Sequence, residues 1–504
     1  GWSLGAVAGG ALPRPRVAFA IAQGLVGGLA LAGLLAHDPR DLLVAQLADP
    51  SPTGQLLVNL GAVARVVLPA SLAMGAALPL AGAIAVTSDA HAGRRLGAAW
   101  LANTAGNAAG AVLTGLALLP ALGMARTAAL LAGLAAVAGA VVFRPGIVAV
   151  APALAFLLVP PERIAWATFP HGRARDEGVL ELREGRSETI VVTGSPEGPA
   201  RLWTNGHPMA STLPSAQRYM RLLAHVPLVA MDAPRRVLVV CFGVGNTLHA
   251  ASLHPLDELV LAETSRDVLA VAPWFAHANR RVLANPRVAP LVDDGRHVLR
   301  GLPAGSLDLV TLEPPPIAYA GVAHLYTREL YALARERLAP GGWMTQWLPA
   351  YQAPAPVVEA LVAAFADVFP GAVVLVGDGR ELILAGVRDG EPRLVDVERR
   401  LRERPAVAED LARIGIGGAR DLVALYAGPA PFGEPMTDDR PVLEAAARSQ
   451  VQVTRLPDGL VDPRGWASFA PDLAGDPVLA ARMAENAAAW RDERFRTFSN
   501  LPAR

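Results

Sequence analysis

Apolar residues dominate the first third of the chain, whereas later segments alternate apolar and polar positions or hold short apolar runs. Four of the early runs are long enough to cross a bilayer as helices, which takes about 17 to 25 residues, and a fifth is shorter. The four are residues 17–36, 56–86, 96–119 and 121–143, and the fifth is 147–159. This pattern predicts a transmembrane helical domain over residues 1–160.

The charges between these runs predict their orientation. Arg94 and Arg95 lie in the loop 88–95, and Arg144 follows the fourth run. Because basic residues concentrate on cytoplasmic loops, we expect both segments to face the cytoplasm. The remainder of the chain is then cytoplasmic too if the run 147–159 does not cross, and it lies on the opposite side if that run crosses.

Regular alternation of apolar and polar residues begins after the apolar region. Three segments bounded by glycine turns show it, namely 178–185, 188–194 and 200–206. A period of two is typical of strands that bury one face. We therefore expect a small antiparallel β subdomain over residues 161–232.

Residues 233–390 alternate short β-branched runs with helix-like segments, which is the pattern of a parallel α/β sheet. The last two expected strands, 373–376 and 381–385, follow each other directly and predict an antiparallel edge. This arrangement is typical of a Rossmann-like domain of the methyltransferase type. Residues 391–504 are rich in Arg, Glu and Ala and are predicted to be mostly helical.

Polar or flexible residues follow four of the expected parallel strands. An acid lies about 20 residues after a glycine turn, the separation at which a carboxylate can accept hydrogen bonds from ribose hydroxyls. Ligands of open α/β sheets bind at the carboxyl ends of the strands, so these positions predict a nucleoside-cofactor site. They are Gly243 and Gly245, Glu263, Asp294 with Gly295, and Glu313.

Charge and cysteine content bear on which partners and metal sites the chain can have. The 504 residues carry 45 basic and 45 acidic side chains and no basic block, which gives no indication of a nucleic-acid partner. The single cysteine, Cys241, excludes an intrachain disulfide framework and a Cys-rich zinc site. We expect no metal. Because 52% of the residues are hydrophobic, the lipid bilayer is an expected partner.

A series of short motifs resembles the spermidine synthases, the polyamine aminopropyltransferases. In chain order they are Tyr219 with Ala224-His225-Val-Pro-Leu228, the glycine turn, Glu263, Asp294-Gly295, Glu313, Leu325-Tyr326, Pro340-Gly-Gly342 and Gln346-Trp347. Others resemble the bacterial membrane-fused branch of that family, namely Gly75-Ala-Ala-Leu-Pro79, Ala102-Asn-Thr-Ala-Gly106, Leu118-Leu-Pro-Ala-Leu-Gly123 and Thr437-Asp-Asp-Arg-Pro441. The resemblance covers about residues 60–445, and the combination of motifs makes it specific.

The resemblance implies a membrane-anchored transferase that moves an aminopropyl group from decarboxylated S-adenosylmethionine to an amine. Glu313 would be catalytic, Glu263 would bind the ribose, Asp294 with Gly295 the adenine edge, and Gly243 with Gly245 the cofactor tail. The residues implied to bind the acceptor are Tyr219, His225, Tyr326, Gln346, Asp438 and Asp439. The resemblance implies a location in the bacterial inner membrane, and it is compatible with a homodimer.

The sequence departs from the family where the cofactor's amine tail and the acceptor's charge would be held. Val244 stands where the glycine turn of these enzymes carries an acid, and Ser215 and Ala216 replace an acidic pair. Met220 and Arg221 replace a His-Glu pair, and the positive charge of Arg221 is expected to repel a polyamine.

These departures keep two other functions open. One is a methyl- or aminocarboxypropyltransferase that uses intact S-adenosylmethionine and acts on an amine or another nucleophile. The other is a transporter or assembly module whose second domain senses a nucleoside.

Overall fold

The structure is a computed structural model that describes residues 1–49, 51–86, 89–166, 177–185, 187–195, 197–317, 319, 321–379, 381–446, 453–455, 457, 460–491 and 497–499. The chain divides into two compact units. Unit 1 comprises Gly1–Val191 and Trp203–His207, and unit 2 comprises Val192–Leu202 and Pro208–Arg504.

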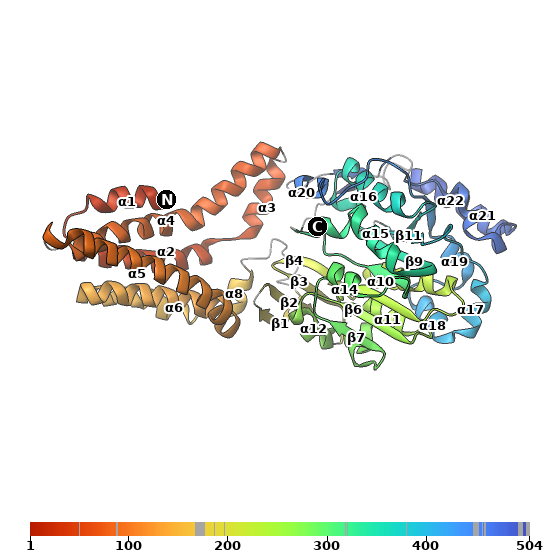
Figure 1. Ribbon diagram of the computed structural model, residues 1–504, viewed down its shortest axis with the longest axis horizontal. Helices are drawn as coiled ribbons and strands as arrows, with labels where there is room; N and C mark the ends of the chain where they lie inside the picture. The colour runs from red at the N-terminus through yellow and green to blue at the C-terminus, as the bar shows by residue number, and fades with distance from the viewer. Residues whose placement is uncertain are drawn as a thin grey trace. The chain divides into compact units, whose positions relative to one another are not determined.

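Unit 1 is built mainly of apolar helices (Figure 1). They are α1 (Trp2–Gly10), α2 (Pro15–Ala36), α3 (Pro39–Ala48), α4 (Pro52–Ala85), α5 (Ala92–Leu113), α6 (Leu119–Val142), α7 (Ala151–Phe156) and α8 (Pro161–Trp166). Among the described residues three stretches are long and apolar enough to cross a membrane, Pro15–Ala36, Thr53–Ala85 and Ala92–Val142. The first two match the predicted runs 17–36 and 56–86.

The third stretch contains both of the remaining long runs. A π-helical turn, Thr114–Leu118, joins α5 to α6, and Gly123 within α6 has φ 76° and ψ 172°. This conformation is not helical, and glycine adopts it without steric cost. The stretch is therefore two helical segments with a break at Gly123, close to the predicted boundary between 96–119 and 121–143.

A small sheet follows the helices in the chain. Its strands β1 (Val179–Glu184), β2 (Thr189–Gly194), β3 (Ala200–Thr204) and β4 (His207–Ser211) are neighbours in chain order. This order is that of a meander with short turns, as the alternating pattern of 178–206 predicts.

The large sheet of unit 2 has eight strands in the order β12-β10-β11-β9-β8-β5-β6-β7. Strands β5, β6, β7, β8 and β9 pair in parallel, and β11 pairs with β9 and β10 in antiparallel fashion. The predicted antiparallel edge is therefore confirmed. The bounds are β5 (Arg236–Val240), β6 (Glu258–Ala262), β7 (Val288–Leu291), β8 (Leu307–Leu312), β9 (Leu338–Leu348), β10 (Val373–Asp378), β11 (Glu381–Val387) and β12 (Tyr426–Pro429).

Helices alternate with the parallel strands, as a Rossmann-like fold of the methyltransferase type requires (Figure 1). The longer helices of unit 2 are α10 (Pro214–Ala230), α11 (Asn246–Ser252), α14 (Gly295–Gly301), α15 (Arg328–Arg337), α16 (Ala355–Val368), α17 (Val397–Glu403), α18 (Pro405–Arg413) and α22 (Pro477–Arg491). The region after residue 391 is not only helical, because it supplies the edge strand β12.

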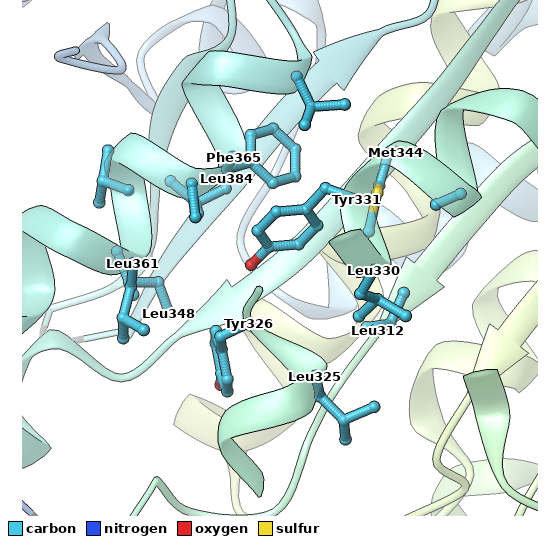
Figure 2. Close-up of a cluster of buried hydrophobic side chains, with 14 of the residues drawn as sticks. Leu312, Leu325, Tyr326, Leu330, Tyr331, Met344, Leu348, Leu361, Phe365 and Leu384 are labelled. Carbon is cyan, nitrogen blue, oxygen red and sulfur yellow. The ribbon is translucent and has the colours of Figure 1, made fainter. Parts of the chain in front are cut away.

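A hydrophobic cluster between α15, α16 and the sheet contains two buried tyrosines, Tyr326 and Tyr331 (Figure 2). The ring of Tyr331 packs edge-on against Phe365 with 5.0 Å between ring centroids. Its hydroxyl group is buried and has no hydrogen-bond partner within the described part of the chain. Leaving a buried hydroxyl unpaired costs stability.

Tyr331→Phe should therefore leave the fold as stable as the wild type or stabilise it by about 1 kcal/mol, because it removes only the unpaired hydroxyl. Tyr331→Ala should destabilise by about 3 to 5 kcal/mol through the cavity that it creates. Thermal unfolding of the detergent-solubilised chain, followed by intrinsic fluorescence, compares the three proteins. A midpoint for Tyr331→Phe as low as that of Tyr331→Ala would contradict this assignment.

Candidate active site

The carboxyl ends of four adjacent parallel strands carry the residues that the sequence singles out. Gly243 and Gly245 follow β5, Glu263 follows β6, Asp294 with Gly295 follows β7, and Glu313 follows β8. Because these strands are neighbours in the order β7-β6-β5-β8, their carboxyl ends share one edge of the sheet. We call these six residues the strand-end cluster.

Three acids of the cluster surround the turn after β5. Burial raises the pKa of the Cys241 thiol, and the charges of Glu263, Glu313 and Asp294 raise it further. Cys241 also has φ 71°, which is uncommon for a residue with a side chain. The strand-end cluster is thus a compact acidic region around a backbone that turns sharply at the end of β5.

The turn requires glycine at its last position. Gly245 has φ 84°, and a Cβ atom there would lie 2.7 Å from the Phe242 ring. Gly243 has φ 54°, and a Cβ atom there would meet only Ala210 at 3.4 Å and a Glu313 oxygen at 4.0 Å. At Gly243 the positive φ, and not a lack of space, is therefore what favours glycine.

Backbone amides orient Glu263, which is 8% exposed. Its Oε2 accepts a hydrogen bond from the Phe242 N–H at 2.8 Å, and its Oε1 accepts one from the Ser265 N–H at 2.9 Å. The Thr264 hydroxyl also donates to Oε1, at 3.4 Å. These bonds fix the direction of the carboxylate at the end of β6. The geometry suits a ribose anchor.

Asp294 is the N-cap residue of α14. Its Oδ1 accepts hydrogen bonds from the N–H groups of Arg296 at 2.9 Å and His297 at 3.2 Å. Its other oxygen lies 3.7 Å from Nε2 of His324. Capping thus fixes Asp294 at the end of β7 and leaves Oδ2 turned toward a second group.

Glu313 is the buried acid of the cluster, at 8% exposure. The Tyr219 hydroxyl donates to its Oε1 at 3.1 Å, and Oγ1 of Thr247 lies 3.2 Å from its Oε2. Burial raises the pKa of Glu313 to about 8, while these two hydrogen bonds oppose the rise and the charge of Glu381 adds to it. A carboxyl group with this pKa exchanges protons readily near neutral pH.

Close packing of α10 against β10 positions Tyr219. A Cβ atom on Gly377 would lie 2.6 Å from Cβ of Tyr219, so glycine is needed for this approach. The Tyr219 ring stacks on Trp347 with 5.5 Å between centroids and 15° between planes. The hydroxyl of a well-packed ring is thereby held against Glu313.

Three of the acceptor residues implied by the resemblance lie in the interior. His225, Tyr326 and Gln346 are each fully buried. The Tyr326 hydroxyl donates to the Trp347 carbonyl at 3.3 Å, and Gln346 Nε2 donates to the Leu325 carbonyl at 3.2 Å. In the structure these side chains support the strand ends and are not exposed beside Glu313.

Asp438 and Asp439 lie at a different part of the site. Asp438 forms a bidentate ion pair with Arg296, in which Oδ1 lies 2.9 Å from Nη1 of the guanidinium group. The same oxygen accepts a hydrogen bond from the Thr327 hydroxyl at 2.7 Å. Asp439 is exposed. The structure therefore brings Asp438 to the α14 side, next to Asp294, and not to the Tyr219 side.

The expected repulsion by Arg221 is wrong, because the side chain points into the interior. Arg221 is 4% exposed and forms an ion pair with Asp410, and its Nη2 donates to Gln217 at 2.9 Å and to the Ala278 carbonyl at 3.0 Å. Its charge is compensated there and is not presented to a ligand.

Sequence reasoning missed four residues around Glu313. They are Thr247, Trp347, Tyr351 and Glu381. The indole N–H of Trp347 donates to Oε2 of Glu381 at 2.7 Å, and the Tyr351 hydroxyl donates to Oε1 at 3.2 Å. The Gln346-Trp347 motif contained a signal, because adjacent residues of a strand point to opposite faces of the sheet, so Trp347 lies on the face opposite to that of Gln346.

The strand order is that of a Rossmann-like domain of the methyltransferase type, with the strand-end cluster at its carboxyl edge. Residues 216–374 match the spermine/spermidine synthase domain. This part of the chain is similar to polyamine aminopropyltransferases and spermidine synthases.

Individual relatives agree with the domain match. A polyamine aminopropyltransferase of Nitrosomonas europaea is 31% identical over 155 residues, which cover 30% of this chain and 46% of the relative. A spermidine synthase of Dictyostelium discoideum is 34% identical over 126 residues, 25% of this chain and 43% of the relative. The chain spans about half the length of the curated relatives that it matches.

Among solved structures, spermidine synthase from Thermotoga maritima aligns with a TM-score of 0.38 and 16% identity. The alignment covers 53% of this chain and 84% of that protein.

Glu263→Gln tests the ribose anchor. The amide keeps the shape but replaces one acceptor oxygen by a donor, so methylthioadenosine should bind about 10-fold or more weakly, equivalent to about 1 to 3 kcal/mol. Isothermal titration calorimetry on the full chain measures the affinity. Glu258→Gln is the matched control, because Glu258 begins the same strand at its far end and pairs with Arg236 at the surface. Equal affinities of wild type and Glu263→Gln for methylthioadenosine would contradict the assignment of Glu263 as the ribose anchor.

Proposed function

We propose that this chain is a membrane-anchored aminopropyltransferase that uses decarboxylated S-adenosylmethionine and an amine acceptor. The observation that carries the proposal is the buried Glu313, held by Tyr219 and Thr247 at a strand end of a spermidine synthase domain. The relatives named polyamine aminopropyltransferase and spermidine synthase support this reaction class.

The strand-end cluster fits an adenosyl group. Glu263 is held at the end of β6, at the distance from the glycine turn that suits a ribose, and Asp294 with Gly295 lies at the neighbouring strand end for the adenine edge. Gly243 lies beside Glu313, because a Cβ atom there would be 4.0 Å from Oε2 of Glu313. When bound, the sulfonium group supplies an activated carbon that an amine nitrogen attacks, with methylthioadenosine as the leaving group.

Glu313 has the properties of the proton acceptor in this reaction. The attacking nitrogen forms a bond to carbon as the carbon–sulfur bond breaks, and the new ammonium group then has a proton to lose. Glu313 can hold the amine through that proton and accept it, because its pKa lies near that of a base working at neutral pH. Tyr219 and Thr247 fix the direction of the carboxyl oxygens.

A second candidate uses intact S-adenosylmethionine. Val244 takes the position of the family's tail-binding acid and is 1% exposed, so it packs in the core and offers no charge to an amine tail. A transferase that moves a methyl or aminocarboxypropyl group would tolerate this loss, because the intact cofactor carries a carboxylate beside its amine. The products distinguish the two candidates.

Glu313→Gln tests the proton acceptor. Turnover should fall about 100-fold or more while methylthioadenosine affinity stays near the wild-type value, because the lost interaction acts in the transition state. Steady-state rates and calorimetry measure both quantities. Glu336→Gln, an exposed acid on α15, is the control. Equal turnover by Glu313→Gln and wild type would leave Glu313 without a catalytic role.

The pH dependence gives an independent check. A carboxyl group with a pKa of about 8 is mostly protonated at lower pH and ionised above it, and only the ionised form accepts a proton. Wild-type kcat/KM should therefore rise with pH around a pH of about 8. This rise should be steeper than the rise that titration of the amine acceptor alone produces. Glu313→Gln should lose this additional rise, and retention of it would assign the titration to another group.

The helices of unit 1 support a membrane anchor, and the basic segments at Arg94, Arg95 and Arg144 support unit 2 in the cytoplasm if the run 147–159 does not cross. The full chain should remain in the membrane fraction after alkaline carbonate treatment, because its apolar helices are long enough to span the bilayer. A topology reporter inserted at residue 91, beside Arg94 and Arg95, should read as cytoplasmic. Release by carbonate would exclude a membrane-spanning anchor, and a periplasmic signal would invert the proposed orientation.

A further inference from the structure

The two hydroxyl groups that orient Glu313 come from different helices. Tyr219 lies on α10 and Thr247 is the second residue of α11, and each hydroxyl lies within hydrogen-bond distance of one Glu313 oxygen, at 3.1 and 3.2 Å. Either helix alone therefore orients only one of the two oxygens. The geometry of the proposed proton acceptor depends on how α10 and α11 are held against each other.

A second buried carboxylate contacts the same two helices. Asp410 of α18 is 5% exposed, and it forms an ion pair with Arg221 of α10. Its Oδ1 lies 3.8 Å from Nε2 of His249 on α11, and its Oδ2 lies 3.0 Å from Nε2 of His225, one turn after Arg221 on α10. Asp410 thus connects α10, α11 and α18 in the interior.

The spacing of these residues along each helix relates the two carboxylates. Arg221 comes two positions after Tyr219, and His249 comes two positions after Thr247. Residues two positions apart in an α-helix point to nearly opposite sides. Asp410 therefore holds α10 and α11 from the side away from Glu313, and a shift of one helix against the other changes the contacts of both carboxylates.

The region around α18 also contacts α10 next to Tyr219. Arg218, the residue before Tyr219, donates from Nη1 to the carbonyl of Ile414, which follows α18, and from Nε to the Gly377 carbonyl at 3.1 Å. Helix α18 lies outside the residues 216–374 that match the synthase domain. The C-terminal region thus supplies part of the framework that holds the site.

We propose that Asp410 is a positioning residue for the transfer reaction, because it holds α10 and α11 so that the hydroxyls of Tyr219 and Thr247 both meet Glu313. The proposal rests on the proposed function for the role of Glu313. The effect of Asp410 passes through the two helices, so its loss should slow the chemical step and leave the affinity for the nucleoside unchanged.

The first test is Asp410→Asn, which keeps the shape of the side chain and removes its charge. Turnover by the full chain in detergent should fall about 10-fold or more, because small displacements of a reacting group have effects of this size. Methylthioadenosine affinity, measured by calorimetry, should stay within about 2-fold of wild type. A fall in affinity that accounts for the whole loss of kcat/KM would overturn the proposal.

A double-mutant cycle tests whether Asp410 acts through the two hydroxyls. In a Tyr219→Phe/Thr247→Val background, Asp410→Asn should lower turnover by less than about 2-fold further, because the contacts through which it acts are already absent. A merely structural role predicts the same fold loss in both backgrounds. Equal losses would therefore overturn the proposal.

Asp410→Asn leaves Arg221 buried without its charged partner, which can unfold the chain. Arg221→Met/Asp410→Leu removes both charges together, and replacement of a buried ion pair by apolar side chains of similar size is often neutral for stability. This double variant should unfold near the wild-type temperature and still show the loss of turnover. Wild-type turnover by the folded double variant would overturn the proposal.

Asp232→Asn is the matched control. Asp232 follows α10 and accepts a hydrogen bond from Arg400 of α17 at 2.7 Å, so it links the end of the same helix to the C-terminal region. Its turnover should stay within about 2-fold of wild type. A loss equal to that of Asp410→Asn would overturn the particular role of Asp410, because any weakening around α10 would then have the same effect.

A measurement without turnover separates this proposal from the proposed function. The chain has six tyrosines, so fluorotyrosine labelling gives few fluorine resonances, and Tyr219→Phe identifies the one from Tyr219. This resonance should move in Asp410→Asn and stay in place in Asp232→Asn. A shift in a protein that transfers no aminopropyl group would support the positioning of Tyr219 and refute the transfer reaction. An unmoved resonance in an active enzyme would do the reverse.

Discussion

The site depends on one carboxyl group that is removed from water. Glu313 at the end of β8 loses most of its hydration, which disfavours its charged form, and hydrogen bonds with Tyr219 and Thr247 only partly compensate. Oγ1 of Thr247 also lies 3.0 Å from the Met220 carbonyl. A hydroxyl group has one proton, so Thr247 can donate only one hydrogen bond. When Thr247 donates to the Met220 carbonyl, a hydrogen bond between Thr247 and Glu313 requires that Glu313 is protonated and donates.

The surrounding structure holds the partners of this carboxyl group in place. Next to Tyr219 on α10, Arg221 pairs with Asp410 of α18, and His225 links Asp410 to His254 through contacts of 3.0 Å on both ring nitrogens. Burial opposes ionisation of Asp410, but the hydrogen bond from His225, the nearby His249 at 3.8 Å and the charge of Arg221 lower its pKa.

This buried network fastens α10 to α18 and to the segment that follows α11. Removal of one member would leave a buried charge uncompensated, at a cost of about 3 to 5 kcal/mol. The residues that replace the expected acids therefore have a structural role: Arg221 fastens the helix whose neighbouring Tyr219 positions Glu313.

Much of the fold could be predicted from the sequence because it follows local patterns. Parallel strands place their carboxyl ends on one edge, so Glu263, Asp294 and Glu313 could be assigned to one region without knowledge of contacts. The edge strand β12 could not, because Tyr-Ala-Gly-Pro is short and contains two residues that are depleted in strands.

The missed parts of the site depend on tertiary register. Glu381 meets Trp347 only because β11 runs antiparallel to β9 in one particular alignment, and Asp438 meets Arg296 across 142 positions of sequence. Neither pairing leaves a local signal. His225 was selected from a motif, but the motif does not reveal that its ring lies in the interior, bonded to Asp410.

The central claim, aminopropyl transfer, is tested most directly by identifying the product. The purified full chain is incubated with 1,4-diaminobutane and either decarboxylated or intact S-adenosylmethionine, and the mixture is analysed by mass spectrometry. The account predicts methylthioadenosine and an aminopropylated amine in equal amounts, formed from the decarboxylated donor. Methylated or aminocarboxypropylated product from the intact donor, or no consumption of either donor, would contradict it.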